Sequence, residues 1–93
     1  MKYIIYQPKE VTFDSFLVKK EVTDYKKDTF KEVYAGDIEV DRIIPTLERL
    51  FAKFNLNHPK DFKGHSLSTG DIVTLGEKSY ICDSFGWKEI NLI

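Results

Sequence analysis

Cys82 and the two histidines, His58 and His65, are the residues of this sequence that could act as a nucleophile and its base. A catalytic cysteine needs its sulfur within hydrogen-bond reach of the histidine ring, and enough exposure for the thiolate to attack. Cys82 lies between Ile81 and Asp83 in a predicted strand, where a small buried hydrophobic residue is the usual occupant. Because no cysteine-enzyme signature surrounds it, the sequence favours a structural cysteine and a protein that is not an enzyme.

A second set of side chains has the composition of a two-histidine, one-carboxylate metal site. Its members are His58, Asp61, His65, Asp71 and Asp83. Their spacing is not that of a helical ligand pair, and His58 directly precedes a proline, which is common in turns. We therefore expect no metal and no cofactor.

The stretch from Gly64 to Asp71, with the sequence GHSLSTGD, superficially resembles a phosphate-binding loop. Such loops work because backbone N–H groups at a helix N-terminus converge on the anion. Here a predicted strand follows instead of a helix, and no lysine follows Gly70. The sequence favours a hydrogen-bonded turn over residues 68–71 that starts a strand, with His65 bonding to backbone carbonyl groups.

The segment DSFGW, residues 83–87, contains an aromatic pair. Phe85 and Trp87 are two residues apart, so on an extended backbone they project to the same side. The area that they can bury favours an inward, core position. If the pair faces outward, it is the kind of aromatic anchor that protein interfaces use.

The elements that must position these residues follow from the hydrophobic pattern. One convincing helix is predicted over residues 43–54, with a single apolar stripe. The stripe consists of Ile43, Leu47, Leu50, Phe51 and Phe54. Because Pro45 suits the first turn of a helix, the N-cap is expected at either Asp41 or Thr46.

Strands are predicted on both sides of this helix, from alternating or continuous apolar residues bounded by turn residues. Their expected positions are residues 3–6, 29–35, 71–75, 79–82 and 87–92. A sixth short strand could contain Val11 and Phe13, followed either by a helical turn over residues 14–18 or by more strand. Gly76-Glu77 predicts a type II′ hairpin turn, and residues 83–86 predict a type I turn. The fold class is therefore α+β, a mostly antiparallel sheet of five to six short strands with one main helix and a turn-rich C-terminal hairpin region.

Length and composition limit the remaining possibilities. The 93 residues predict a single domain over residues 1–93, with no membrane span and no secretory leader. A single cysteine excludes an internal disulfide and fits a cytoplasmic setting. The formal net charge is −1 and both signs are mixed along the chain, which disfavours nucleic acid as a partner.

Several short motifs occur in the same order as in the YodL-like domains, small proteins and modules of Gram-positive bacteria and their mobile elements. They are Phe54-Asn55, His58-Pro59, Asp61-Phe62, Gly64-His65-Ser66-Leu67-Ser68, Asp71-Ile72-Val73 and Asp83-Ser84-Phe85-Gly86-Trp87-Lys88-Glu89. The chain resembles that family over nearly its whole length, and the run over residues 54–68 is the most specific part. Two departures are the tight Gly76-Glu77 turn, where members often have an insert, and Trp87, where many have phenylalanine. The resemblance implies an accessory binding module and supplies no catalytic residues.

Three functions therefore remain open, of which a non-catalytic protein-binding module of a mobile element is preferred. It would modulate a host or element protein, as a monomer or weak homodimer, through an interaction site of six residues. These are His65, Ser66, Asp83, Ser84, Phe85 and Trp87. The first alternative is a nucleic-acid-associated accessory factor that stacks bases on Tyr3, Tyr6, Tyr34 and Trp87. The second is a small enzyme that uses His65 with Asp83 and Cys82.

Overall fold

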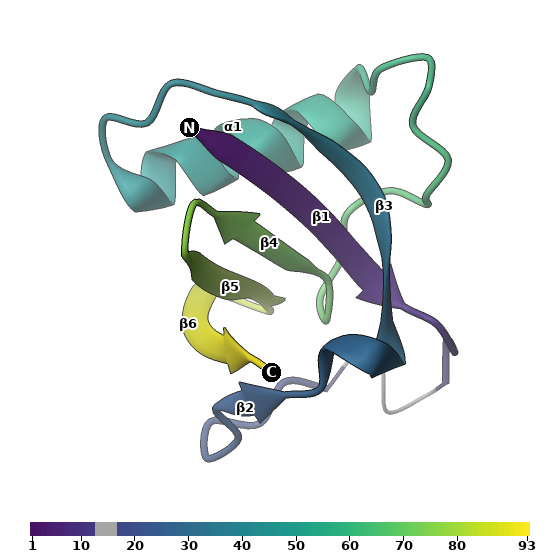
Figure 1. Ribbon diagram of the computed structural model, residues 1–93, viewed down its shortest axis with the longest axis vertical. Coiled ribbons are helices and arrows are strands. Elements are labelled where there is room, and N and C mark those ends of the chain that lie inside the picture. The colour runs from purple at the N-terminus through teal and green to yellow at the C-terminus, as the bar shows by residue number, and fades with distance from the viewer. Residues whose placement is uncertain (13–16) are drawn as a thin grey trace.

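A curled six-stranded sheet organises the chain, which the computed structural model describes over residues 1–12 and 17–93 (Figure 1). Its spatial order is β2-β6-β5-β4-β1-β3, and every neighbouring pair is antiparallel except β2 with β6. The elements are β1 (Lys2–Pro8), β2 (Asp24–Tyr25), the 3-10 turn η2 (Lys27–Thr29), β3 (Phe30–Asp37), α1 (Ile43–Leu56), β4 (Ile72–Leu75), β5 (Lys78–Asp83) and β6 (Gly86–Leu92). The prediction of an α+β fold with a mostly antiparallel sheet is confirmed.

Two tight turns join the last three strands. Leu75 pairs with Lys78 across the Gly76-Glu77 turn, and Gly76 has a φ of +60° while Glu77 does not have a positive φ. This is the backbone that a type II′ turn requires, so that prediction is confirmed. The β5–β6 turn is equally short, because Asp83 pairs with Gly86, whose φ is +129°.

Helix α1 begins at Ile43, as predicted, and ends at Leu56, two residues beyond the predicted end at Phe54. Neither Asp41 nor Thr46 is the N-cap, so that prediction is wrong; Arg42 takes the position and makes no side-chain capping bond. Pro45, at the third helical position, has no N–H for a capping side chain to satisfy. Thr46 instead donates its hydroxyl to the carbonyl oxygen of Arg42 (2.7 Å).

The two faces of the sheet carry separate apolar clusters. The first packs against α1 and contains Tyr3, Ile5, Leu47, Leu50, Phe54, Phe62, Leu67, Val73, Leu75 and Tyr80. The second lies on the opposite face and contains Tyr6, Ile72, Ile81 and Ile90, with residues from β2, β3 and the chain before β2 packed on it. Helix α1 thus covers one side of the sheet, and Val18, Tyr25 and Phe30 pack on the other.

The segment between β1 and β3 differs most from the sequence-based expectations. Val11 belongs to no strand, whereas Phe13 and the start of the alternative helical turn lie outside the described residues. The unpredicted strand β2 pairs with the end of β6. Lys88 stabilises the approach to β2, because its ammonium group donates to the carbonyl oxygens of Lys19, Lys20 and Val22 at 2.6–2.8 Å. Within residues 1–12 and 17–93, no helix is long and apolar enough to cross a membrane.

Candidate functional site

A row of four residues crosses the helix-facing side of the sheet and links the two parts of the predicted site. The Gln7 side chain donates to the Asp71 carboxylate. The backbone carbonyl oxygen of Asp71 accepts from the Cys82 N–H, and Cys82 pairs with Trp87 in the β5–β6 ladder. Side chains alternate along a strand, so Gln7 shares the face of Tyr3 and Ile5, which pack against α1. The predicted residues His65 and Asp83 lie beside opposite ends of this row.

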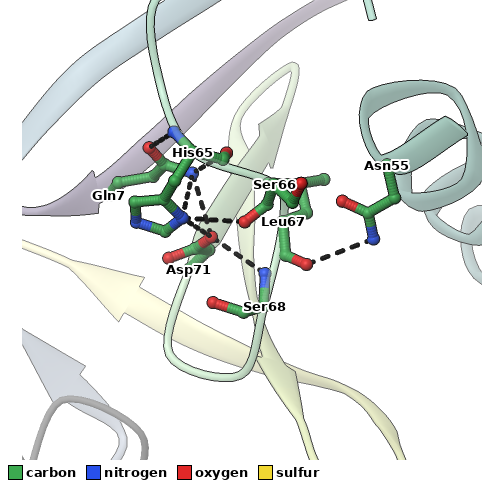
Figure 2. Close-up of polar contacts among 7 residues, drawn as sticks. All are labelled: Gln7, Asn55, His65, Ser66, Leu67, Ser68 and Asp71. Carbon is green, nitrogen blue, oxygen red and sulfur yellow. Dashed lines mark hydrogen bonds and ion pairs between the residues drawn. The ribbon is translucent and has the colours of Figure 1, made fainter. Parts of the chain in front are cut away.

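Gln7 attaches the loop between α1 and β4 to strand β1 (Figure 2). Its side-chain amide accepts from the His65 N–H (3.2 Å) and donates to the His65 carbonyl oxygen (2.8 Å), as a neighbouring strand would. The same nitrogen donates to Asp71 Oδ2 (3.1 Å). Gln7 is completely buried, so these bonds offset the cost of removing its amide from water.

The His65 ring is half-exposed and is held through one nitrogen. Its Nδ1 lies 2.7 Å from the carbonyl oxygen of Ser66 and 4.0 Å from Asp71 Oδ2. Since a carbonyl oxygen only accepts, Nδ1 is the protonated nitrogen and donates to Ser66. This agrees with the favoured interpretation of the loop, in which His65 bonds to a backbone carbonyl group.

Asp71 is the buried acid of this region, with only 1% of its surface exposed. Burial raises its pKa from 3.8 to about 6, although bonds from Ser68 and Gln7 and the nearby His65 ring act in the opposite direction. Asp71 Oδ2 accepts from the Ser68 N–H (3.0 Å), and the Asp71 N–H donates to the Ser68 carbonyl oxygen (3.1 Å). The turn predicted over residues 68–71 is therefore present, and a strand follows it.

Cys82 lacks the environment of a nucleophilic cysteine. Burial first, then the carboxylates of Asp71, Glu48 and Asp83, raise the pKa of its thiol to about 11. Activated cysteines show the opposite change, because nearby cations stabilise their thiolates. Its Sγ donates weakly to the Asp83 carbonyl oxygen (3.8 Å).

His58 lies apart from these groups, with its Nδ1 3.0 Å from the carbonyl oxygen of Pro59 and its ring against Phe62. In the described part of the chain, no three His, Cys, Asp or Glu side chains gather closely enough to hold a metal ion. This includes the set whose composition was considered in the sequence, His58, Asp61, His65, Asp71 and Asp83.

The tip of the β5–β6 hairpin forms the second part of the predicted site. Phe85 is fully exposed there, with a relative accessibility of 102%. Asp83 accepts from the Ser84 N–H (2.6 Å) and so fixes the turn. Trp87 is half-buried, and its ring is nearly perpendicular to that of Phe51, with a centroid distance of 6.4 Å.

Three expectations about the aromatic residues are wrong. The core position that the sequence favoured for the aromatic pair is wrong for Phe85, which is fully exposed in the turn. The two side chains also do not project together, because only Trp87 is on the strand. The stacking platform of Tyr3, Tyr6, Tyr34 and Trp87 is also not formed. Tyr3 and Tyr6 are buried in clusters on opposite faces of the sheet, and Tyr34 stacks on Tyr3.

Sequence reasoning missed three residues that shape the site. Gln7 is a polar residue that alternates with Tyr3 and Ile5, and a polar residue on a buried face is a signal that could have identified it. Asn55 donates to the Leu67 carbonyl oxygen (3.2 Å), but its buried Oδ1 has no partner (Figure 2). No local pattern distinguishes Lys88 from the other lysines.

Comparison with known proteins identifies a family. The family model described as YodL-like domain matches residues 3–92, which is nearly the entire chain. No curated protein and no solved structure matches the chain. Because the match includes both the loop that holds His65 and the β5–β6 hairpin, the chain belongs to the YodL-like domain family.

Proposed function

We propose that this chain is a non-catalytic protein-binding module of a mobile genetic element, which modulates a host or element protein in the cytoplasm by docking on its surface. The observation that carries the proposal is the fully exposed Phe85 at the tip of the β5–β6 hairpin. The turn itself is stabilised by Asp83 and Gly86, so the fold does not require an aromatic side chain at this position.

The surroundings of Phe85 support a docking role. Half-buried Trp87 and Phe51 lie next to the turn and extend the aromatic surface toward α1. Aromatic residues supply most of the binding energy in many interfaces, and polar groups around them fix the orientation. In the proposed complex, Phe85 inserts into the partner while Asp83 and Ser84 provide polar contacts at the same turn.

His65 and Ser66 provide a second contact region on the same molecule. They lie beside Gln7, which is separated from Trp87 by three strand spacings, or about 14 Å at roughly 4.8 Å each. An interface of standard size extends over this distance. One partner can therefore contact both regions at once.

Site-specific photocrosslinking tests this proposal. The photoreactive amino acid p-benzoylphenylalanine is placed at position 85 of this chain in cells of a Gram-positive bacterium. A second variant of the same chain carries it at position 56. Leu56 is the matched control, because it is also a hydrophobic residue with 86% exposure but lies at the end of α1.

We expect a discrete protein adduct from position 85 that is absent from position 56. Equal adducts from both positions, or no protein adduct from position 85, would contradict the proposal. Phe85 is a better probe than Trp87 because removing Trp87 also removes its contact with Phe51.

A further inference from the structure

Beside the docking turn lies a hollow of 180 Å³ between α1 and the β5–β6 hairpin. Glu48 and Phe51 line it from the helix, and Asp83 and Trp87 are among the hairpin residues on the other side. Its volume exceeds the roughly 150 Å³ of an engineered cavity that admits benzene. One planar side-chain group therefore fits.

The walls of the hollow are aromatic and meet at a corner. The rings of Phe51 and Trp87 are inclined by 85° to each other. In such a corner, a flat cation stacks on the face of one ring while the other ring borders it. Cations are attracted to the faces of aromatic rings, most strongly to tryptophan.

The rim of the hollow carries negative charge that the chain does not neutralise. Glu48 lines the hollow from α1 and Asp83 lines it from the β5–β6 hairpin, so two acidic residues border the same space. Within residues 1–12 and 17–93, no lysine or arginine lies within ion-pair distance of the Glu48 or Asp83 carboxylate. Covering them with an apolar side chain would remove them from water without compensation.

We propose that this hollow receives one arginine side chain of the partner protein, which stacks against the Phe51–Trp87 corner and pairs with Glu48 and Asp83. Arginine fits better than lysine because its guanidinium group is planar, stacks on aromatic rings and binds carboxylates through two nitrogens. The inference deepens the proposed docking function and rests on it. It identifies the partner as a protein with an accessible arginine.

Small model compounds test the inference without the partner. Acetyl-arginine N-methylamide is titrated into the ¹⁵N-labelled protein at constant ionic strength, and the indole signal of Trp87, the only tryptophan, is followed by NMR. The neutral citrulline derivative and the lysine derivative are titrated in parallel. We expect a saturable shift in the millimolar range with arginine, a clearly weaker one with lysine and none with citrulline.

Charge-removing variants locate the binding site. Glu48→Gln combined with Asp83→Asn is expected to weaken arginine binding about threefold to tenfold, because each exposed ion pair contributes modestly. Asn at position 83 keeps the oxygen that accepts from Ser84, so the turn is preserved. Glu77→Gln, at the exposed β4–β5 turn, is the control for the loss of one charge.

Equal responses to arginine and citrulline, or to arginine and lysine, would overturn the assignment of a guanidinium site. An equal loss of binding in Glu77→Gln and in Glu48→Gln alone would show only a general charge effect and also overturn it. If arginine fails to bind while crosslinking at position 85 captures a protein, the inference fails and the docking function stands. If arginine binds while crosslinking at position 85 captures no protein, the docking function fails, and the assignment of the hollow to an arginine of a partner protein fails with it.

Discussion

Asp71→Asn gives a quantitative test of the buried polar network that joins the loop to the sheet. Burial raises the pKa of Asp71 from its ordinary value of 3.8 to about 6. Below pH 4 the carboxyl group is protonated in both the folded and the unfolded chain. Between about pH 4 and pH 6 the folded chain retains this proton more strongly, so stability falls as the pH rises through this window. Above pH 6 the folded protein holds a buried carboxylate.

The size of the effect follows from the same change in pKa. At about 1.36 kcal/mol per pKa unit, raising the pKa from 3.8 to about 6 lowers the free energy of unfolding by about 3 kcal/mol at neutral pH. Asparagine does not titrate, and its oxygen can still accept from Gln7 and Ser68. Asp71→Asn is therefore expected to leave stability nearly unchanged at pH 4 and to raise the free energy of unfolding by up to about 3 kcal/mol at pH 7.

Urea unfolding at a series of pH values between 4 and 8, followed by circular dichroism, measures this difference. Asp37→Asn, at an exposed position at the end of β3, is the matched control and should follow the wild-type curve within about 0.5 kcal/mol. The reasoning is refuted if Asp71→Asn is no more stable than the wild type at pH 7. It is also refuted if the difference between the two proteins does not grow from pH 4 to pH 7.

Three further changes test other parts of the structure. Gly64→Ala places a methyl group against the buried amide of Gln7, so we expect it to lower the free energy of unfolding by about 1–3 kcal/mol in urea titrations. Lys88→Met frees the three carbonyl groups that its ammonium binds and should speed amide hydrogen exchange before β2, with little change elsewhere; unchanged exchange there would contradict this role. Phe54→Ala should lower the free energy of unfolding by about 3–5 kcal/mol, because Phe54 is fully buried. Phe85→Ala should change it by no more than about 0.5 kcal/mol. Similar losses in the two variants would mean that Phe85 supports the fold.

Much of the fold follows from local pattern. The stripe from Ile43 to Phe54 places the helix correctly, because one apolar face must pack against the sheet. The dipeptide Gly76-Glu77 is enough to predict the β4–β5 hairpin turn, because glycine readily adopts the positive φ that the first turn position requires. Strand β2 could not be found in this way, because two residues in parallel pairing with β6 depend on a contact between distant parts of the chain.

The candidate site is predictable in type but not in arrangement. The sequence identifies His65 and Trp87 by their side chains, yet their separation depends on Gln7, Asp71 and Cys82, which come from three different strands or strand ends. The inference that Phe85 shares a side with Trp87 assumed a continuous strand. Because the turn reverses the chain at this point, only the three-dimensional structure shows that Phe85 is exposed and Trp87 is half-buried.

The most direct test of the docking account is the affinity of the crosslinked partner for three proteins: the wild type, Phe85→Ala and Leu56→Ala. Both substitutions remove an exposed hydrophobic side chain, but only Phe85 lies in the proposed interface. We predict that Phe85→Ala weakens binding at least tenfold, or by about 1.4 kcal/mol, while Leu56→Ala binds like the wild type. Equal affinities for all three proteins would contradict the account.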